Sequence, residues 1–153
     1  MIRRLAADLI SLLVAIPAAL WIIRREKLIL KHGRPLRHAE LDFASEIGIA
    51  DPGAIRILSL PQIPSPLGGL LAPLENKVGF SLGSAAGVTL GYGIYLAEDH
   101  ESLPLIRHEL VHVRQYERLG GPLPFIRRYL FECLACGYDH SPLEREAVDL
   151  GGN

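Results

Sequence analysis

Cysteine is scarce in this chain of 153 residues, which contains only Cys133 and Cys136. Two cysteines cannot build a disulfide framework, and a lone CxxC provides only half of a four-cysteine zinc site. The pair also lacks the βαβ context of a thioredoxin-like redox motif. We therefore interpret both cysteines as small buried residues, one turn apart on a helix.

An excess of charge of either sign is also lacking, because 16 basic and 17 acidic residues give a formal net charge of -1. The basic residues gather after an apolar segment and do not follow an element that could enter a nucleic acid groove. We expect no nucleic acid partner. No internal repeat with a period of about 20–50 residues is visible, which excludes solenoid and propeller architectures.

Apolar residues are plentiful, at 49% of the chain, and the longest apolar run covers residues 5–23. As a helix this run would extend roughly 28 Å, about the hydrocarbon thickness of a bilayer. Trp21 lies near one end, where an interfacial aromatic residue is common. Basic residues flank the run on both sides: Arg3, Arg4, Arg24, Arg25 and Lys27. We predict that residues 1–27 form a single N-terminal membrane anchor.

Three residues inside the run, Asp8, Ser11 and Pro17, argue against a simple membrane span. A helix that lies on the membrane surface, or one packed on the domain, therefore remains an alternative. A cleaved signal peptide is disfavoured because basic residues follow at once and no small-x-small site closes the run. The larger basic cluster lies after the run, which would place the domain in the cytoplasm.

Residues 28–153 form the second unit, for which the patterns predict an α+β domain. Hydrophobic periodicity and turn residues predict helices at 37–47, 103–119, 124–136 and 142–150. Alternating apolar residues predict strands at 55–60, 78–82 and 88–96. A loop rich in proline and glycine covers residues 61–73.

The residues that indicate chemistry are His108-Glu109-Leu110-Val111-His112. Positions i and i+4 of a helix differ by only about 40° around its axis, so both imidazoles can reach one metal ion. The glutamate beside the first histidine is turned by roughly 100°, where it can hold a water without ligating the metal. We predict that His108 and His112 are metal ligands and that Glu109 is a general base.

The surrounding helix fits this interpretation. Ser102 can cap its start, and Gly120-Gly121 ends it. The histidines and Gln115 share one face, and apolar side chains occupy the opposite one (Ile106, Leu110 and Val113). A helix with apolar side chains on one face and histidines on the opposite face is predicted to be central in the fold and to line a cleft.

A catalytic zinc site needs a third protein ligand, and His140, Glu144 and Glu146 are the downstream candidates. Glu144 and Glu146 differ by about 200° on a helix, so only one of them can face the metal. Ala147 and Val148 lie beside Glu144 and would allow close packing, so we favour Glu144. The alternative is that Glu144 forms a capping box with Ser141.

His108-Glu109-Leu110-Val111-His112, followed by Glu144-x-x-Ala147, resembles the gluzincin branch of the zinc metallopeptidases, which includes thermolysin and membrane-embedded peptidases. The chain is similar to minimal bacterial forms whose later helix begins Pro-x-Glu-x-Glu-Ala. The resemblance implies a zincin-like small sheet on the HExxH helix, zinc as cofactor, Glu144 as third ligand, and residues 88–96 as a strand that binds substrate backbone. The chain departs from the family at Val148, where members often carry an aspartate that orients a histidine.

The resemblance implies hydrolysis of peptide bonds in a peptide or protein substrate, by a water that the zinc activates and Glu109 deprotonates. A further donor would stabilise the oxyanion, and Tyr138, His140 and Tyr116 are the candidates. A rival function is that of a membrane-anchored binding or scaffold protein that retains an inactive zincin fold. Val148 favours the rival, and the intact Glu109 argues against it, since a structural metal site needs no general base.

Overall fold

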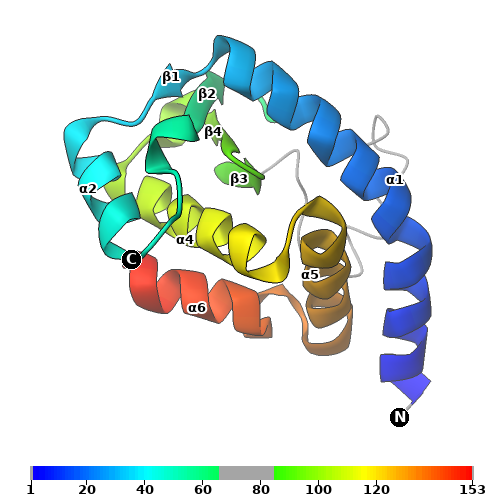
Figure 1. Cartoon of the computed structure of the whole chain (residues 1–153). Coiled ribbons are helices and arrows are strands. Elements are labelled where there is room, and N and C mark those ends of the chain that lie inside the picture. Colours follow the sequence, from blue (N-terminus) through cyan, green and yellow to red (C-terminus); the bar gives the residue numbers. More distant parts are fainter. Residues whose placement is uncertain (1, 66–84, 153) are drawn as a thin grey trace.

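A small mixed sheet lies between one long helix and a group of shorter helices (Figure 1). The computed structural model describes residues 2–65 and 85–152. Its elements are α1 Ile2–His32, β1 Arg34–Pro35, α2 His38–Glu46, η1 Pro52–Ala54, β2 Arg56–Leu60, β3 Gly87–Leu90, β4 Gly93–Ala97, η4 Glu98–His100, α4 Leu103–Leu119, α5 Pro122–Cys136, η5 Tyr138–His140 and α6 Pro142–Gly151. The predicted α+β class is confirmed.

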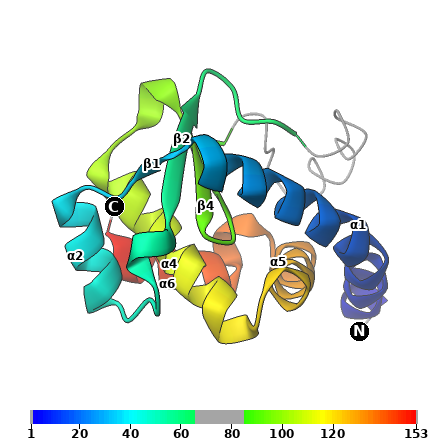
Figure 2. The ribbon, with the colours of Figure 1, turned by 45° about the horizontal axis from the view of Figure 1, so that its top comes forward.

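The strands follow the order β1-β2-β4-β3, in which β2 and β4 are parallel and the other two pairs are antiparallel. Side chains alternate between the two faces of the sheet. On β4, Ile94 and Leu96 join a core with α2 and α4, and Tyr95 joins a second core with Ile22 and Ile29 of α1. Figure 2 shows α1 crossing one face of the sheet while α4 covers the other.

The single strand predicted at 88–96 is wrong, because β3 and β4 form a hairpin. Leu90 pairs with Gly93, so Gly91 and Tyr92 form a two-residue turn, and Gly91 has a φ of 72°. Such tight turns need a positive φ, which glycine adopts without strain. The strand predicted at 78–82 lies outside the described residues.

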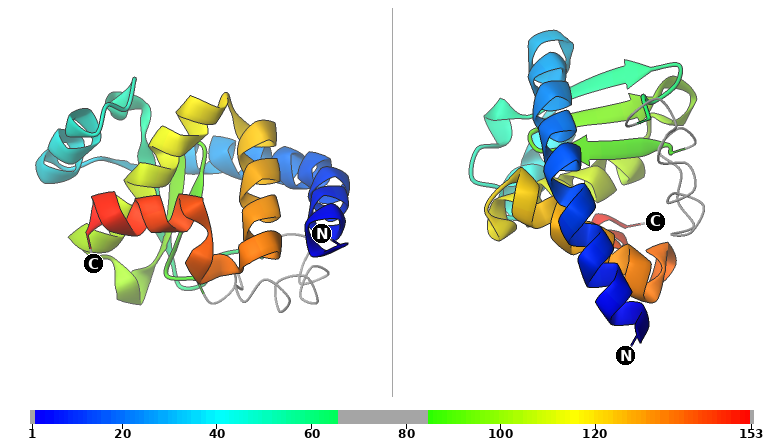
Figure 3. Two further views of the ribbon diagram at one scale, coloured as in Figure 1. Left: turned by 90° about the horizontal axis from the view of Figure 1, so that it is seen from below. Right: turned by 90° about the vertical axis from the view of Figure 1, so that its right-hand side faces the viewer.

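The long helix α1 has two neighbours. Its C-terminal half covers the sheet, and its N-terminal half runs beside α5 (Figure 3). The predicted boundary after residue 27 falls inside this helix, between the buried Ile22 and Ile29. By length and composition α1 could cross a membrane, a test that buried core helices and N-terminal signal sequences also pass.

The helix ends follow the local sequence. The predicted bounds of α4 are confirmed, and Gly120 ends it in the left-handed region with a φ of 88°. Ser102 occupies the N-cap position but its side chain makes no capping hydrogen bond. The prediction of two buried cysteines is confirmed for Cys133 and wrong for Cys136. Cys136 is the last residue of α5, and its side chain is exposed to solvent.

A buried carboxylate joins β1 to α2. Glu40 accepts hydrogen bonds from both terminal nitrogens of Arg34, at 2.8 and 2.9 Å, and from the Arg37 backbone N–H at 2.7 Å. Burial alone would raise the pKa of Glu40, but these donors hold it below its ordinary value of 4.5. The charged carboxylate is therefore the form that the fold stabilises.

Glu40→Gln should lower the free energy of unfolding at neutral pH by about 2–3 kcal/mol, since hydrogen bonds to charged groups contribute about 1.5–3 kcal/mol. Because the folded-state pKa is lowered, this contribution is present above pH 4.5 and is lost as the pH falls through the folded-state value. Urea unfolding should show a gap between wild type and variant that narrows on acidification. A gap independent of pH would contradict this account of Glu40.

Candidate metal centre

Two histidines of α4 and one glutamate of α6 converge on one point. The Nε2 atoms of His108 and His112 lie 3.2 Å apart. The Glu144 carboxylate lies 3.3 Å from Nε2 of His108 and 3.4 Å from Nε2 of His112. His112 and Glu144 are buried, and His108 is half-buried. These three residues could hold a metal ion.

Small residues let α6 approach α4 closely enough for this contact. Ala147 is fully buried, and a Cβ added to Gly151 would lie 2.8 Å from the backbone of His108. Val148, which we expected beside Glu144 on the packed face, is 40% exposed instead. Ala147 and Gly151, four residues apart, therefore define the face of α6 that meets α4.

The start of α6 is fixed by a residue that the sequence did not reveal as important. Glu132 of α5 is buried, and its Oε2 accepts hydrogen bonds from the Ser141 hydroxyl and the Leu143 backbone N–H, both at 3.0 Å. Ser141 makes no capping hydrogen bond of its own, so the capping box considered for Glu144 does not form. Glu132 caps α6 instead, which leaves Glu144 to face the histidines.

Among the described residues, neither rival third ligand belongs to this group. Glu146 accepts hydrogen bonds from Arg118 at 2.8 and 2.9 Å and from Gln115 at 3.0 Å. His140 is exposed on η5. Our geometric prediction, that the Glu144 carboxylate and no other candidate lies against both histidines, is confirmed.

Glu109 lies next to this cluster and faces the edge of the sheet. The hydroxyl of Thr89 on β3 has one proton to donate, and it lies 2.6 Å from Oε2 of Glu109 and 2.9 Å from the Glu109 backbone carbonyl oxygen. A Cβ added to Gly87 would lie 2.7 Å from Oε1 of Glu109. Gly87 and Thr89 are alternate residues of β3, so both face α4. Glycine and threonine at these positions therefore allow β3 to hold a buried carboxylate.

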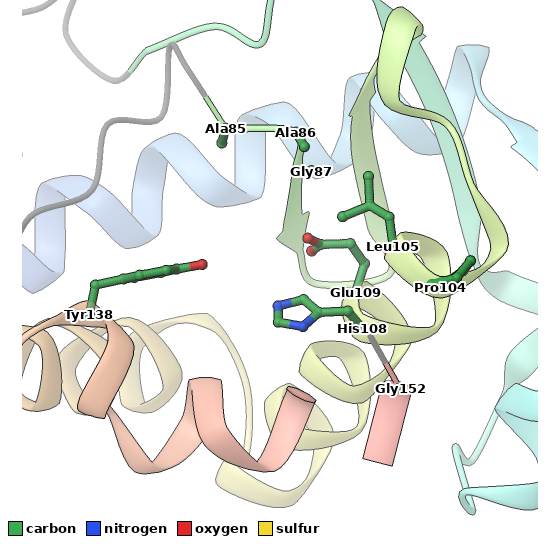
Figure 4. Close-up of a pocket in the computed structure, with 9 residues that line it drawn as sticks. All are labelled: Ala85, Ala86, Gly87, Pro104, Leu105, His108, Glu109, Tyr138 and Gly152. Atoms are coloured by element: carbon green, nitrogen blue, oxygen red, sulfur yellow. The ribbon is translucent and has the colours of Figure 1, made fainter. Parts of the chain in front are cut away.

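A pocket with a volume of about 290 Å³ opens beside His108 and Glu109. Residues 85–87 and Pro104, Leu105 and Gly152 form its other walls, and Tyr138 completes the lining. Figure 4 shows the Tyr138 ring reaching across the pocket with its hydroxyl directed toward the two α4 residues. Tyr116, another predicted oxyanion donor, instead packs edge-on against Tyr92 and Phe125, with ring centroids 6.4 and 6.2 Å apart.

Burial and mutual charges shift the pKa values of the residues in this cluster. Burial lowers the pKa of His112, but its hydrogen bond to Glu144 and the charge of that residue outweigh burial and raise the pKa to about 9. Burial would raise the pKa of Glu144, yet hydrogen bonds from His108 and His112 lower it well below 4.5. Burial raises the pKa of Glu109 above 4.5, against the opposing effect of the two histidines.

Tyr129 and Gln115 also touch the cluster, in roles that the sequence analysis missed. Tyr129 of α5 donates a hydrogen bond from its hydroxyl to Oε1 of Glu144 at 2.6 Å. Burial and the Glu144 charge raise the pKa of Tyr129 well above 10.0, so it remains a donor. Gln115 lies 2.8 Å from Nδ1 of His112. The signal for Gln115 was its place on the histidine face of α4.

Comparison with known proteins adds no relative from which a function could be carried over. No family model, no curated protein and no solved structure matches the chain. The functional argument therefore depends on the geometry of this cluster and on the chemistry of its side chains.

Proposed function

We propose that this chain is a zinc metallopeptidase of the HExxH type, which hydrolyses peptide bonds with Glu109 as general base. One observation carries the proposal: the Nε2 atoms of the two histidines lie 3.2 Å apart, and Glu144 places one carboxylate oxygen 3.3 Å from the first and its other oxygen 3.4 Å from the second. Ligands at about 2.0–2.2 Å from one tetrahedral ion stand roughly 3.3–3.6 Å apart. The donor set and the spacing thus both fit zinc.

His108, His112 and Glu144 would hold the ion as three protein ligands, beside the pocket that His108 and Glu109 line. When bound, zinc polarises a carbonyl oxygen and lowers the pKa of a coordinated water to about 7. Two histidines and one glutamate are the ligand set of known catalytic zinc sites. A purely structural site closes all four positions with protein ligands and does not need an adjacent buried carboxylate.

Glu109 takes the proton of the attacking water and delivers it to the leaving amine. Burial raises its pKa, which brings it closer to the neutral range where a general base works best. Thr89 donates to Oε2 and so fixes the carboxylate in one orientation. Tyr138, whose hydroxyl faces the same pocket, donates a hydrogen bond to the developing oxyanion (Figure 4).

The proposed function is tested by cleavage of a peptide mixture. Full-length protein loaded with zinc should generate new amino termini in denatured protein or a peptide library, detected by mass spectrometry. A chelator such as phenanthroline should abolish the cleavage, and added zinc should restore it. Cleavage that persists after complete removal of metal would contradict a metallopeptidase.

The outward face of α1 supports membrane association. Its first half exposes six large apolar side chains, each more than half exposed: Leu5, Leu9, Leu12, Leu13, Ile16 and Leu20. These positions fall within an arc of roughly 100° on a helix. The opposite side, which includes Ala7, Ser11 and Ala15, is buried. We propose that a lipid bilayer covers the apolar face while the opposite face stays packed on the domain.

The full-length protein should therefore float with lipid vesicles on a density gradient. Leu13→Asp should reduce the bound fraction at least about tenfold, because a carboxylate in the hydrocarbon costs about 2.5–3.5 kcal/mol. Leu13 is 68% exposed, so the fold should tolerate the change. Leu41→Asp on α2 is the matched control and should float like the wild type. If both variants behave like the wild type, α1 does not contact lipid.

A further inference from the structure

Gln115 is a fully buried polar side chain near the metal centre, with an exposure of 0%. It lies one turn after His112 on α4, and its Oε1 is 2.8 Å from Nδ1 of that histidine. A buried amide is stable only when its donors and acceptor are satisfied. The hydrogen bonds of Gln115 therefore show which atoms of its neighbours are donors and which are acceptors.

The orientation of this amide is determined by its other end. Nε2 of Gln115 donates to the Leu143 backbone carbonyl at 2.9 Å and to Oε2 of Glu146 at 3.0 Å. Both partners are pure acceptors. Rotating the amide by half a turn would set its oxygen against two acceptors, so the oxygen must face His112.

An oxygen at this position dictates the tautomer of His112. Since Oε1 can only accept, Nδ1 must carry the proton, and a neutral imidazole protonated there has its lone pair on Nε2. Nε2 is the atom that faces His108 and Glu144 at 3.2 and 3.4 Å. Gln115 thus presents the correct nitrogen of His112 to a metal.

The same amide connects the two helices that carry the ligands. Leu143, whose carbonyl accepts from Gln115, directly precedes Glu144 on α6. His112 precedes Gln115 by three residues on α4. One side chain therefore bonds to a ligand on one helix and to the backbone beside a ligand on the other.

We infer that Gln115 is a positioning residue of the metal centre, which fixes the tautomer and ring orientation of His112 and sets the distance between α4 and α6. It performs the histidine-orienting role that Val148 cannot provide. The inference rests on the proposed zinc site but is independent of peptidase activity. Groups that orient a ligand in this way typically change metal affinity 10–100-fold when they are removed.

Gln115→Leu keeps the approximate volume and removes both ends of the amide. Its zinc dissociation constant, measured by competition with a chromophoric chelator, should rise about 10–100-fold. Val113→Ala is the control, because Val113 is fully buried in the core on the other side of α4. This variant should lose stability but bind zinc within about twofold of the wild type. Equal affinity in wild type and Gln115→Leu would overturn the inference.

Proton exchange at His112 provides a second readout, which does not depend on an affinity measurement. Nitrogen-proton NMR of the zinc-loaded protein should show a slowly exchanging proton on Nδ1 of His112, which Gln115→Leu should expose to rapid exchange. A His112 that binds zinc through Nδ1 would overturn the inference. If zinc binds and Gln115→Leu has its effect but no peptide is cleaved, the proposed peptidase fails and the inference stands.

Discussion

Glu109→Gln should retain zinc at the wild-type stoichiometry and lower kcat about 10²–10⁴-fold on any peptide that the wild type cleaves. Glutamine preserves the shape of the side chain and can still accept the hydrogen bond that Thr89 donates at 2.6 Å. It cannot take a proton from water. The variant therefore separates the chemistry of Glu109 from its place in the fold, and initial rates on one peptide measure the difference.

A control for this substitution lies on the same helix. Glu117 accepts hydrogen bonds from Tyr92 and from the Ala50 backbone N–H, away from the pocket lining. Glu117→Gln should keep full turnover once corrected for folded protein. Equal rates for Glu109→Gln and wild type would remove Glu109 from the mechanism and would favour the rival function, a scaffold that retains an inactive zincin fold.

Glu144→Ala should weaken zinc binding by more than the roughly 100-fold that loss of an orienting group causes, because it removes one of three protein ligands. Its carboxylate is buried between the two histidines, at 3.3 and 3.4 Å. Loss of this charge also leaves the ion without a neutralising partner in a site of low polarity. Chelator competition on the purified full-length protein measures the effect.

Two control variants distinguish the loss of a metal ligand from a general disturbance of the structure of α6 and its surroundings. Glu146→Ala should weaken zinc binding at most about tenfold, because Gln115 keeps its hydrogen bond to the Leu143 carbonyl. His140→Ala should leave binding unchanged, since this residue is exposed. A loss in either control that equals the loss in Glu144→Ala would contradict the assignment of Glu144 as the third ligand.

The helices could be predicted from the sequence because their signals are local. Apolar periodicity and Gly120 were enough to place α4, and Pro142 marked the start of α6. The hairpin of β3 and β4 could not be distinguished from one strand, since a two-residue turn preserves the alternation of apolar residues. The glycine at position 91 was the only local sign of that turn, and its φ of 72° explains why it is there.

In the candidate site too, the residues that could be predicted are those whose positions follow from local geometry. His108, Glu109 and His112 lie within one helical turn, so their shared face follows from helix geometry alone. Glu144 could be chosen by comparing the faces of α6, although Gly151 rather than Val148 allows the close packing. Three residues that orient these groups were missed because each meets its partner on another element: Thr89, Tyr129 and Glu132. Gln115 was placed on the histidine face, but its hydrogen bond to the Leu143 carbonyl of α6 could not be predicted from that.

The most direct test of the central claim is the metal content of the full-length protein, purified under zinc-replete conditions and measured by elemental analysis. The wild type should contain about one zinc per chain, as a single site with three protein ligands requires. His108→Ala and His112→Ala should contain almost none, because each loses one of the two nitrogen ligands. A wild-type protein without zinc under these conditions, or histidine variants that keep it, would contradict the metal centre and the function proposed from it.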